Sequence, residues 1–425
     1  MTPLRFCFLT TFYPPYNFGG DGVAVRRLAE GLTRWGHHVT VVHDVDAYEA
    51  LNGGRRPSVA SDAASGVEVV SLRSGFGAVS SLLTQQLGRP VVQSRRLRRI
   101  LAEGRFDVVT FHNISLLGGP GLLAYGGDAV KIYIAHEHWL VCPTHVLWRH
   151  NREPCSGREC LRCALHYRRP PQLWRSTGYL ERQLAHVDAF VALSRFSRDK
   201  HREFGFPREM EVLPHFLPAA PAVRDTAEPG PHPRPYFLFV GRLERLKGLD
   251  DVIPLFGEDA DADLVVIGDG TEEGRLRHQA AGRSRVVFRG RVAGEELDRY
   301  YRHAVALLVP SRGFETFGIV VIEAFRHGTP VLARSIGALP ELVDASGAGE
   351  LFESAADLVV KMRRLQREPA RRARYAANAV AAFRERWSEA AVIPQYLALV
   401  DRVRRERGLV VRPAPAATGE PLAVR

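Results

Sequence analysis

Short apolar runs alternate with amphipathic stretches through the first half of the chain. The stretch 21–35 is of the amphipathic type. Its Val23, Leu28 and Leu32 recur on one helical stripe. The apolar runs have the length of buried strands, and they are the segments 4–10, 38–43, 107–111 and 130–135. Strands that alternate with helices predict a parallel sheet covered by helices on both faces.

The same alternation starts again after a proline-rich stretch. Residues 218–235 contain six prolines, a density typical of a linker between domains. Beyond it, apolar runs again predict strands, at 236–240, 263–267, 285–288, 305–309 and 329–332. The predicted fold class is therefore α/β, with two doubly wound domains in tandem. Such domains bind ligands outside the carboxyl ends of their strands.

Length and composition agree with this picture. The chain has 425 residues, too many for one compact core, and its 45% hydrophobic content excludes a disordered chain. No run approaches the roughly 18 consecutive apolar residues of a membrane span, and the N-terminus lacks a secretory pattern, so a cytoplasmic protein is expected. Residues 389–410 are predicted to be helical, and residues 411–425 to be a disordered tail.

The net charge of +11 favours anionic partners. Arginine clusters at 95–99 and 371–374 lie in segments with a helical pattern. A solvated helix face is the ordinary interpretation, and peripheral contact with the inner membrane face is the alternative. The basic residues are spread along the chain without an RNA-binding signature, so no binding to nucleic acid is expected.

Two loops that follow predicted strands have the composition of phosphate-binding sites. Gly19 and Gly20 open the first helix, where close backbone approach and free amides suit a phosphate, although such a pair is also an ordinary turn. In the second domain Gly241 is followed by Arg242 and Lys247, two cations that can neutralise a diphosphate together. Exposed loop cations are the alternative interpretation.

Two carboxylates follow the predicted strand at 305–309. If a helix begins near Phe317, Glu323 lies within it and Glu315 lies on the preceding loop. Glu323 can then accept hydrogen bonds from a ribose diol. Glu315 can hold sugar hydroxyls above the helix N-terminus, whose partial positive charge faces the phosphates. Because Glu323 has apolar neighbours in the sequence, its carboxylate requires a partner.

These segments resemble the donor-binding domain of retaining glycosyltransferases of family 4, which have the GT-B fold. The resemblance rests on FVGRLERLKG, LVVIGDGTEEGRL and PSRGFETFGIVVIEAFRHGTPVLARSIGALPELV. The N-terminal PPYNFGGDGVAVRRLAEGLTRWGHHVTVV is similar to the opening of the acceptor domain. The resemblance implies two Rossmann-like domains that face each other across a cleft, an acceptor domain at 1–217 and a donor domain at 236–388. It also implies a C-terminal helix packed back on the N-terminal domain.

The resemblance also implies roles for individual residues. The catalytic residues would be His112, Arg242, Lys247 and Glu315. The donor-binding residues would be Gly19, Gly20, Gly241, Arg242, Lys247, Glu315, Phe317, Gly318 and Glu323. His112 matches a position where the family often has an active-site histidine, and a loop histidine without a ligand is the alternative. One departure from the family pattern is His215, at a hinge position where many relatives have an Asn-Gly pair after the proline.

The implied function is transfer of a sugar, with retention, from a nucleoside diphosphate sugar to a hydroxyl acceptor. The acceptor would be a glycan, a lipid-linked sugar or a small molecule, and the pathway would be synthesis of cell-envelope polysaccharide or glycolipid. The implied mechanism uses no enzymic nucleophile and no cofactor for catalysis. The alternatives are a glycosyltransferase of secondary metabolism and a non-catalytic relative that binds sugar nucleotides.

Four of the five cysteines fall within a short insert at about 136–175. They are Cys142, Cys155, Cys160 and Cys163. The last three have a C-x4-C-x2-C spacing that is compatible with a structural zinc. Unligated thiols are the alternative, and disulfides are not expected in a reducing compartment. The segment resembles an insert found in the acceptor domain of a subset of these transferases.

Overall fold

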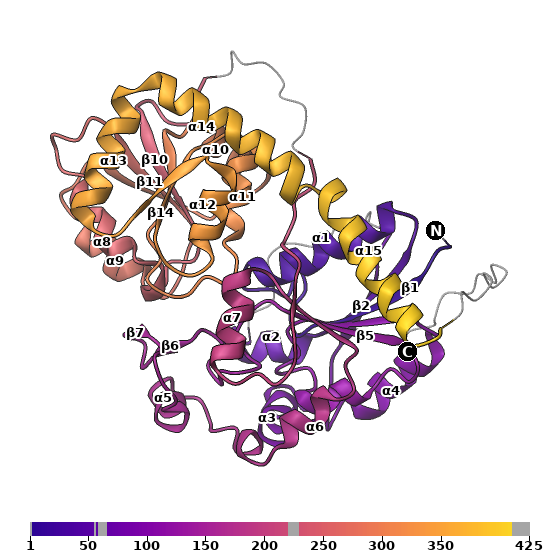
Figure 1. Cartoon of the computed structure of the whole chain (residues 1–425). Coiled ribbons are helices and arrows are strands. Elements are labelled where there is room, and N and C mark those ends of the chain that lie inside the picture. The colour runs from indigo at the N-terminus through magenta and orange to yellow at the C-terminus, as the bar shows by residue number, and fades with distance from the viewer. Residues whose placement is uncertain (1, 55–56, 58–65, 220–228, 410–425) are drawn as a thin grey trace.

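The computed structural model describes residues 2–54, 57, 66–219 and 229–409. Figure 1 shows two α/β domains, each built on a parallel sheet with helices on both faces, and the predicted fold class is confirmed. The predicted tail at 411–425 and residues 220–228 of the predicted linker lie outside the described residues. Among the helices that the structure describes, none has the length and apolarity needed to cross a membrane.

The first sheet has the strand order β3-β2-β1-β4-β5-β8-β9, and its neighbouring strands are parallel. Its strands are β1 (Arg5–Leu9), β2 (His38–Asp44), β3 (Glu68–Leu72), β4 (Val108–Phe111), β5 (Val130–Ala135), β8 (Ala189–Ala192) and β9 (Glu211–Val212). The order changes direction between β1 and β4. The loops that leave these two strands therefore diverge to opposite faces, and the crevice between them is where such folds bind ligands.

The helices of this domain include four long ones and three shorter ones. They are α1 (Gly20–Arg34), α2 (Val45–Leu51), α3 (Ala78–Leu87), α4 (Ser94–Glu103), α5 (Cys160–His166), α6 (Tyr179–Leu184) and α7 (Arg195–Glu203). The cysteine-rich insert adds the two-stranded hairpin β6 (Trp148–Arg149) and β7 (Glu153–Pro154), and 3₁₀ turns lie at η2 (Pro120–Ala124) and η3 (Leu173–Ser176).

The second sheet has the order β12-β11-β10-β13-β14-β15, again parallel throughout. Its strands are β10 (Tyr236–Val240), β11 (Asp263–Ile267), β12 (Val286–Gly290), β13 (Ala306–Val309), β14 (Val331–Arg334) and β15 (Gly349–Phe352). Here the direction changes between β10 and β13. The two loops with candidate chemistry, after β10 and after β13, therefore emerge from neighbouring strands at one edge of the sheet.

The helices around the second sheet complete this domain. They are η4 (Arg245–Lys247), α8 (Leu249–Val252), η5 (Ile253–Leu255), α9 (Glu273–Gln279), α10 (Gly294–His303), α11 (Ile319–Arg326), α12 (Leu339–Ser346), α13 (Ala355–Arg367) and α14 (Pro369–Ala382). A π-helical turn, η6 (Phe383–Trp387), then leads the chain back toward the first domain.

The last helix, α15 (Glu389–Glu406), packs on the first domain, as Figure 1 shows and as the sequence predicts. The Tyr396 hydroxyl lies 2.7 Å from Thr110 Oγ1 on β4. Ile393 packs on Gly31 of α1 so closely that a Cβ on this glycine would lie 3.1 Å from Ile393 Cδ1. The chain thus returns from the second domain through η6, and its last helix belongs to the first domain.

The N-terminus of α7 makes a second contact between the domains. Ser194 caps this helix and its hydroxyl donates a 2.7 Å hydrogen bond to the carbonyl of Thr316, on the loop after β13. The amides of Arg195 and Phe196 donate to the carboxylate of Glu341 on α12. A carboxylate from one domain therefore satisfies free amides at a helix start of the other domain.

Candidate active site

Glu315 and Lys247 meet at the edge of the second sheet, although 68 positions separate them in the chain. Lys247 Nζ donates to Glu315 Oε1 over 2.6 Å, and the Ser311 hydroxyl donates to the same oxygen over 2.6 Å. Burial by itself raises the pKa of a carboxyl. Here the cation and the hydroxyl outweigh burial, so the pKa of Glu315 lies below its ordinary value. At neutral pH Glu315 is a charged acceptor.

A glycine holds the loop of Glu315 in place from behind. Gly337 has φ of +65°, and a Cβ on it would lie 2.7 Å from Glu315 N and 2.9 Å from Glu315 O. The amide of Ala338 donates to Glu315 O over 3.0 Å. Gly318, with φ of +101°, is the N-cap of α11, which begins at Ile319, close to the predicted start near Phe317. The helix α11 thus begins four residues after Glu315, and its first amides have no partner within the helix.

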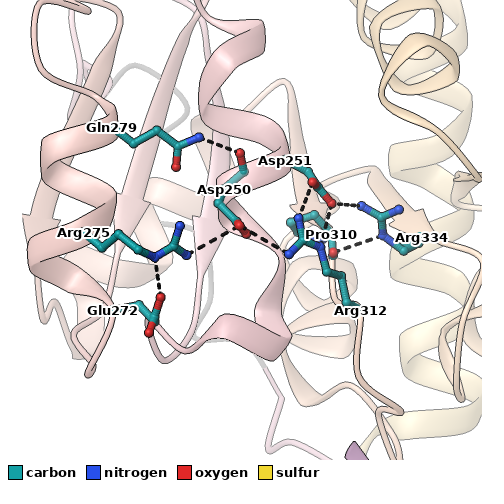
Figure 2. Close-up of polar contacts among 8 residues, drawn as sticks. All are labelled: Asp250, Asp251, Glu272, Arg275, Gln279, Pro310, Arg312 and Arg334. Carbon is teal, nitrogen blue, oxygen red and sulfur yellow. Dashed lines mark hydrogen bonds and ion pairs between the residues drawn. The ribbon is translucent and has the colours of Figure 1, made fainter. Parts of the chain in front are cut away.

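An ionic network beneath the loop fixes it to the rest of the domain (Figure 2). Arg312, which follows β13, is paired with Asp250 and Asp251 at the start of α8. Arg334 at the end of β14 donates to Asp251 Oδ2 over 2.6 Å and to the carbonyl of Pro310 over 3.2 Å. The loop after β10 and the loop after β13 are therefore clamped together just below the Lys247–Glu315 pair.

Asp251→Asn is expected to lower the free energy of unfolding by about 1 kcal/mol at pH 7, since two arginines share this carboxylate. Burial raises the pKa of Asp251, but Arg312 and Arg334 outweigh it and hold this pKa below its ordinary value. The stabilisation is therefore complete above about pH 4, the ordinary range of an aspartate, and is lost as the pH falls through the lower folded pKa. Urea unfolding at a series of pH values measures the difference, with the exposed Asp344→Asn as control. If the native protein and Asp251→Asn still differed as much in their free energy of unfolding at low pH, the stabilisation would not come from the ion pairs of Asp251.

The glycine pair of the first domain lies against residues of the second domain at this site. A Cβ on Gly19 would lie 3.6 Å from Arg242 Nε, and one on Gly20 would lie 3.9 Å from Ile319 Cγ2 at the start of α11. Gly19 thus lies near Arg242 and Gly20 near the start of α11, and binding of a donor diphosphate by these residues stays a prediction. A larger side chain at the pair would fill the space between the two domains.

Asp21, which is not among the predicted site residues, lies close enough to the same charges for them to act on its carboxyl. Burial raises the pKa of its carboxyl and the charge of Glu137 raises it further, whereas Arg242 and Lys247 act in the opposite direction. Its position directly after the glycine pair, in the first turn of α1, is the signal that would have found it. The site therefore contains three carboxylates, from Asp21, Glu137 and Glu315, near two cations.

Glu323 finds its required partner in the other domain. Arg27 Nη2 on α1 donates to Glu323 Oε1 over 3.0 Å, and the Tyr301 hydroxyl donates to Glu323 Oε2 over 3.0 Å. The ion pair with Arg27 links the α1 and α11 helices across the domain boundary. Contact of Glu323 with a ribose stays a prediction, and Arg27 is a contact that no local sequence pattern indicates.

A row of rings connects His112 to the second domain. His112 Nδ1 lies 2.8 Å from His136 Nε2, the ring of His136 stacks on that of His215 at 5.2 Å, and His215 meets Phe317 edge to face at 5.4 Å. Burial lowers the pKa of His112 and His215 well below the ordinary value and that of His136 to about 4, so all three rings are neutral at pH 7.

Two members of this row, His112 and His136, have polar atoms that bear on the site. The Nε2 atom of His112 is buried and has no hydrogen-bond partner among the described residues. The backbone of His136 accepts a 2.8 Å hydrogen bond from Thr316 Oγ1, next to Glu315. His136 directly follows the end of β5, and His215 occupies the hinge position where the sequence departs from the family pattern. Both positions could therefore have been predicted from the sequence as part of the site.

The cysteine-rich insert lies beside the loop of Glu315. The side chains of Cys142, Cys155, Cys160 and Cys163 line one cavity of about 20 Å³, and all four are free thiols. Among the described residues no group of three or more His, Cys, Asp or Glu is arranged to hold a metal ion. The structural zinc therefore stays a prediction. Within the insert, His145 Nδ1 lies 2.6 Å from Glu137 Oε1, and the charge of Glu137 acts on Asp21 of the site.

Two family models match the chain in succession. The model described as Glycosyltransferase Family 4 matches residues 18–220, and the model described as Glycosyl transferases group 1 matches residues 225–381. The chain is 29% identical over 404 residues to a D-inositol 3-phosphate glycosyltransferase of Xylanimonas cellulosilytica, covering 88% of this chain and 89% of the relative. It is 26% identical over 369 residues to an uncharacterized glycosyltransferase of Methanocaldococcus jannaschii, covering 80% and 83% respectively.

Solved structures show the same fold. A sucrose-phosphate synthase of Thermosynechococcus elongatus superposes with a TM-score of 0.71 at 18% identity, over 95% of this chain and all of that one. HepE of Anabaena in complex with UDP-glucose superposes with a TM-score of 0.65 at 15% identity, over 94% of this chain and all of that one. These likenesses confirm the GT-B fold. With the two family models matched in succession across most of its length, the chain belongs to the glycosyltransferases of the family 4 type.

Proposed function

We propose that this protein transfers a sugar, with retention at the anomeric carbon, from a nucleoside diphosphate sugar to a hydroxyl acceptor. One observation carries the proposal. Glu315, Lys247 and Arg242 converge at the direction change of the second sheet, opposite the glycine pair at the direction change of the first. A carboxylate for sugar hydroxyls thus lies beside two cations and a helix N-terminus suited to a diphosphate.

The cations have the largest role in this proposal. Bond breaking between the anomeric carbon and the diphosphate oxygen develops negative charge on the leaving group. Arg242, Lys247 and the free amides of α11 stabilise that charge, which is the kind of preorganised electrostatic stabilisation that lowers barriers most. The acceptor oxygen then attacks from the side on which the diphosphate departed and gives its proton to the departing diphosphate oxygen, so no enzymic nucleophile is required.

The remaining residues position the sugar and the nucleotide. Glu315 accepts hydrogen bonds from sugar hydroxyls, with the amides of Phe317 and Gly318 nearby, and Glu323 holds the ribose. Because the ring of His112 is neutral and its buried Nε2 is unpartnered among the described residues, it can bond to a hydroxyl of the transferred sugar. Residues 1–217 would bind the acceptor and residues 236–388 the donor.

Relatives and structural neighbours indicate which substrates to test first. HepE of Anabaena has been solved with UDP-glucose, and TarM of S. aureus with UDP. A relative from Rhizobium meliloti, 30% identical over half of this chain, is named a lipopolysaccharide core biosynthesis glycosyltransferase. We therefore propose a UDP sugar as the first donor and a cell-envelope glycan or glycolipid as the acceptor class.

A thermal-shift screen of UDP, GDP, ADP and dTDP sugars tests the donor site. A ligand that binds only the native state adds stability of about 2.7 kcal/mol at a hundredfold excess over its Kd. We expect one nucleotide to shift the unfolding midpoint of the native protein and to shift Glu323→Gln much less. The amide keeps an oxygen for Arg27 and Tyr301 but removes the charge that binds a ribose diol best.

The control is Glu353→Gln, which changes an exposed carboxylate of the same domain and should respond to nucleotide like the native protein. A folded native protein that responds to none of the four nucleotide classes would contradict the proposed donor site.

A further inference from the structure

The helix α3 is inverted relative to an ordinary surface helix. Its buried residues are Ser80, Ser81 and Thr84, all small and polar. Its exposed residues are apolar, namely Val79 at 52% exposure, Leu82 at 47%, Leu83 at 37% and Leu87 at 46%. A surface helix of a globular protein normally turns such a stripe toward the core. The outer face of α3 is therefore suited to an apolar environment rather than to water.

Neighbouring segments extend this apolar surface. Phe76, just before α3, is 64% exposed, and Leu173 on η3 is 71% exposed. The turn η3 is attached to α3, because Trp174 Nε1 donates to the carbonyl of Gln85 over 2.8 Å. We name this surface the α3 apolar face, consisting of Phe76, Val79, Leu82, Leu83, Leu87 and Leu173.

The segment 69–102, which carries α3 and α4, has an excess of positive charge, although its Arg73 is paired with Glu49 of α2 and its Ser74 donates to Asp46. Residues 69–102 contain six arginines and no aspartate or glutamate. The next helix, α4, buries Leu97 and Leu101 against the domain. It turns Arg95, Arg98 and Arg99 to the exterior. In Figure 1, α3 and α4 both lie along the lower side of the first domain, away from the second domain.

We propose that the α3 apolar face and the arginines of α4 bind the surface of an anionic lipid bilayer. In this arrangement α3 lies in the plane of the interface with its leucines at the level of the acyl chains, and the arginines contact the lipid phosphates. Both features are required, because the apolar face alone supplies no preference for anionic lipid and exposed arginines alone are an ordinary solvated surface.

Charge also distinguishes this occupant from a second copy of the chain. A twofold contact places the same surface of two copies against itself. Such a contact through the α3 apolar face would bring the α4 arginines of both copies together, with no carboxylate of residues 69–102 to compensate them. An anionic bilayer supplies the opposite charge. The inference does not depend on the proposed function, since no residue of the candidate active site belongs to this surface.

Co-sedimentation of the full chain with vesicles tests the inference. We expect binding to phosphatidylcholine vesicles that contain phosphatidylglycerol, little binding to phosphatidylcholine alone, and weaker binding as the salt concentration rises. Arg95→Gln with Arg99→Gln is expected to weaken binding about 30-fold, since each arginine near the surface contributes about 1 kcal/mol. Leu82→Ser with Leu83→Ser is expected to weaken it by about tenfold or more.

A matched control separates this surface from exposed apolar residues in general. Val360 on α13 of the second domain is 61% exposed, and Val360→Ser should leave vesicle binding unchanged. Unfolding midpoints establish that each variant is folded. Failure of the native chain to bind anionic vesicles would overturn the proposal, as would equal binding by the Leu82 and Leu83 variant. Dimerisation that this variant abolishes, without vesicle binding, would assign the surface to a second copy instead.

Discussion

Replacing Lys247 with alanine is expected to lower kcat/KM for sugar transfer by about 10²–10³-fold, the usual effect of removing one group that stabilises transition-state charge. Lys247 lies at the end of η4, where its ammonium is 2.6 Å from Glu315, so one cation both holds this carboxylate and faces the proposed diphosphate site. Steady-state kinetics with the donor found by the thermal-shift screen measure the effect.

Lys361→Ala is a matched control for this prediction. Lys361 also makes a 2.6 Å ion pair, with Asp357. Both residues lie on α13, which carries none of the predicted site residues. Lys247→Arg keeps the charge and changes its geometry, and we expect only partial recovery because a planar guanidinium does not replace a point charge. A Lys247→Ala enzyme as active as the Lys361→Ala enzyme would remove Lys247 from the mechanism.

Glu315→Gln is expected to lower kcat/KM by about 10²-fold or more, because a charged acceptor of sugar hydroxyls is lost and Lys247 is left without its partner. The same change should lower the free energy of unfolding by about 1–3 kcal/mol, the cost of leaving one buried polar group unsatisfied. Kinetics and urea unfolding of the same preparation measure the two effects separately.

The pH dependence gives a further check on Glu315. Its pKa lies below the ordinary value of about 4.3 for a glutamate. Its contribution to stability is therefore complete above that value, and it is lost as the pH falls through the lower folded pKa. The part of the stability difference between the native protein and Glu315→Gln that comes from the Glu315 charge should be lost only in acid. A smaller change near pH 7 is expected from Asp21, whose pKa is raised to about 7, chiefly by burial and in part by Glu315. A difference that is already lost between pH 7 and pH 5 would contradict a charged, paired Glu315.

The residues of the candidate site that lie in short loops after strands could be predicted from the sequence. Gly241, Arg242 and Lys247 follow β10, and Glu315 follows β13, so strand periodicity and loop composition locate them without any tertiary information. Asp21 was overlooked, although the sequence carries it directly after the glycine pair. The inverted α3 was also overlooked, since an apolar stripe at helical spacing is ordinarily interpreted as a core-facing stripe.

The α/β class, the two domains and the identity of the cations and carboxylates follow from the amino-acid sequence, because strand length, helical spacing and loop composition are local properties. Which of these groups meet depends on the folded chain. The order of strands puts β10 beside β13, which brings Lys247 to Glu315, and the packing of one domain on the other brings Arg27 to Glu323. Contacts between distant segments depend on how sheets and domains pack, and no local pattern in the chain encodes that packing.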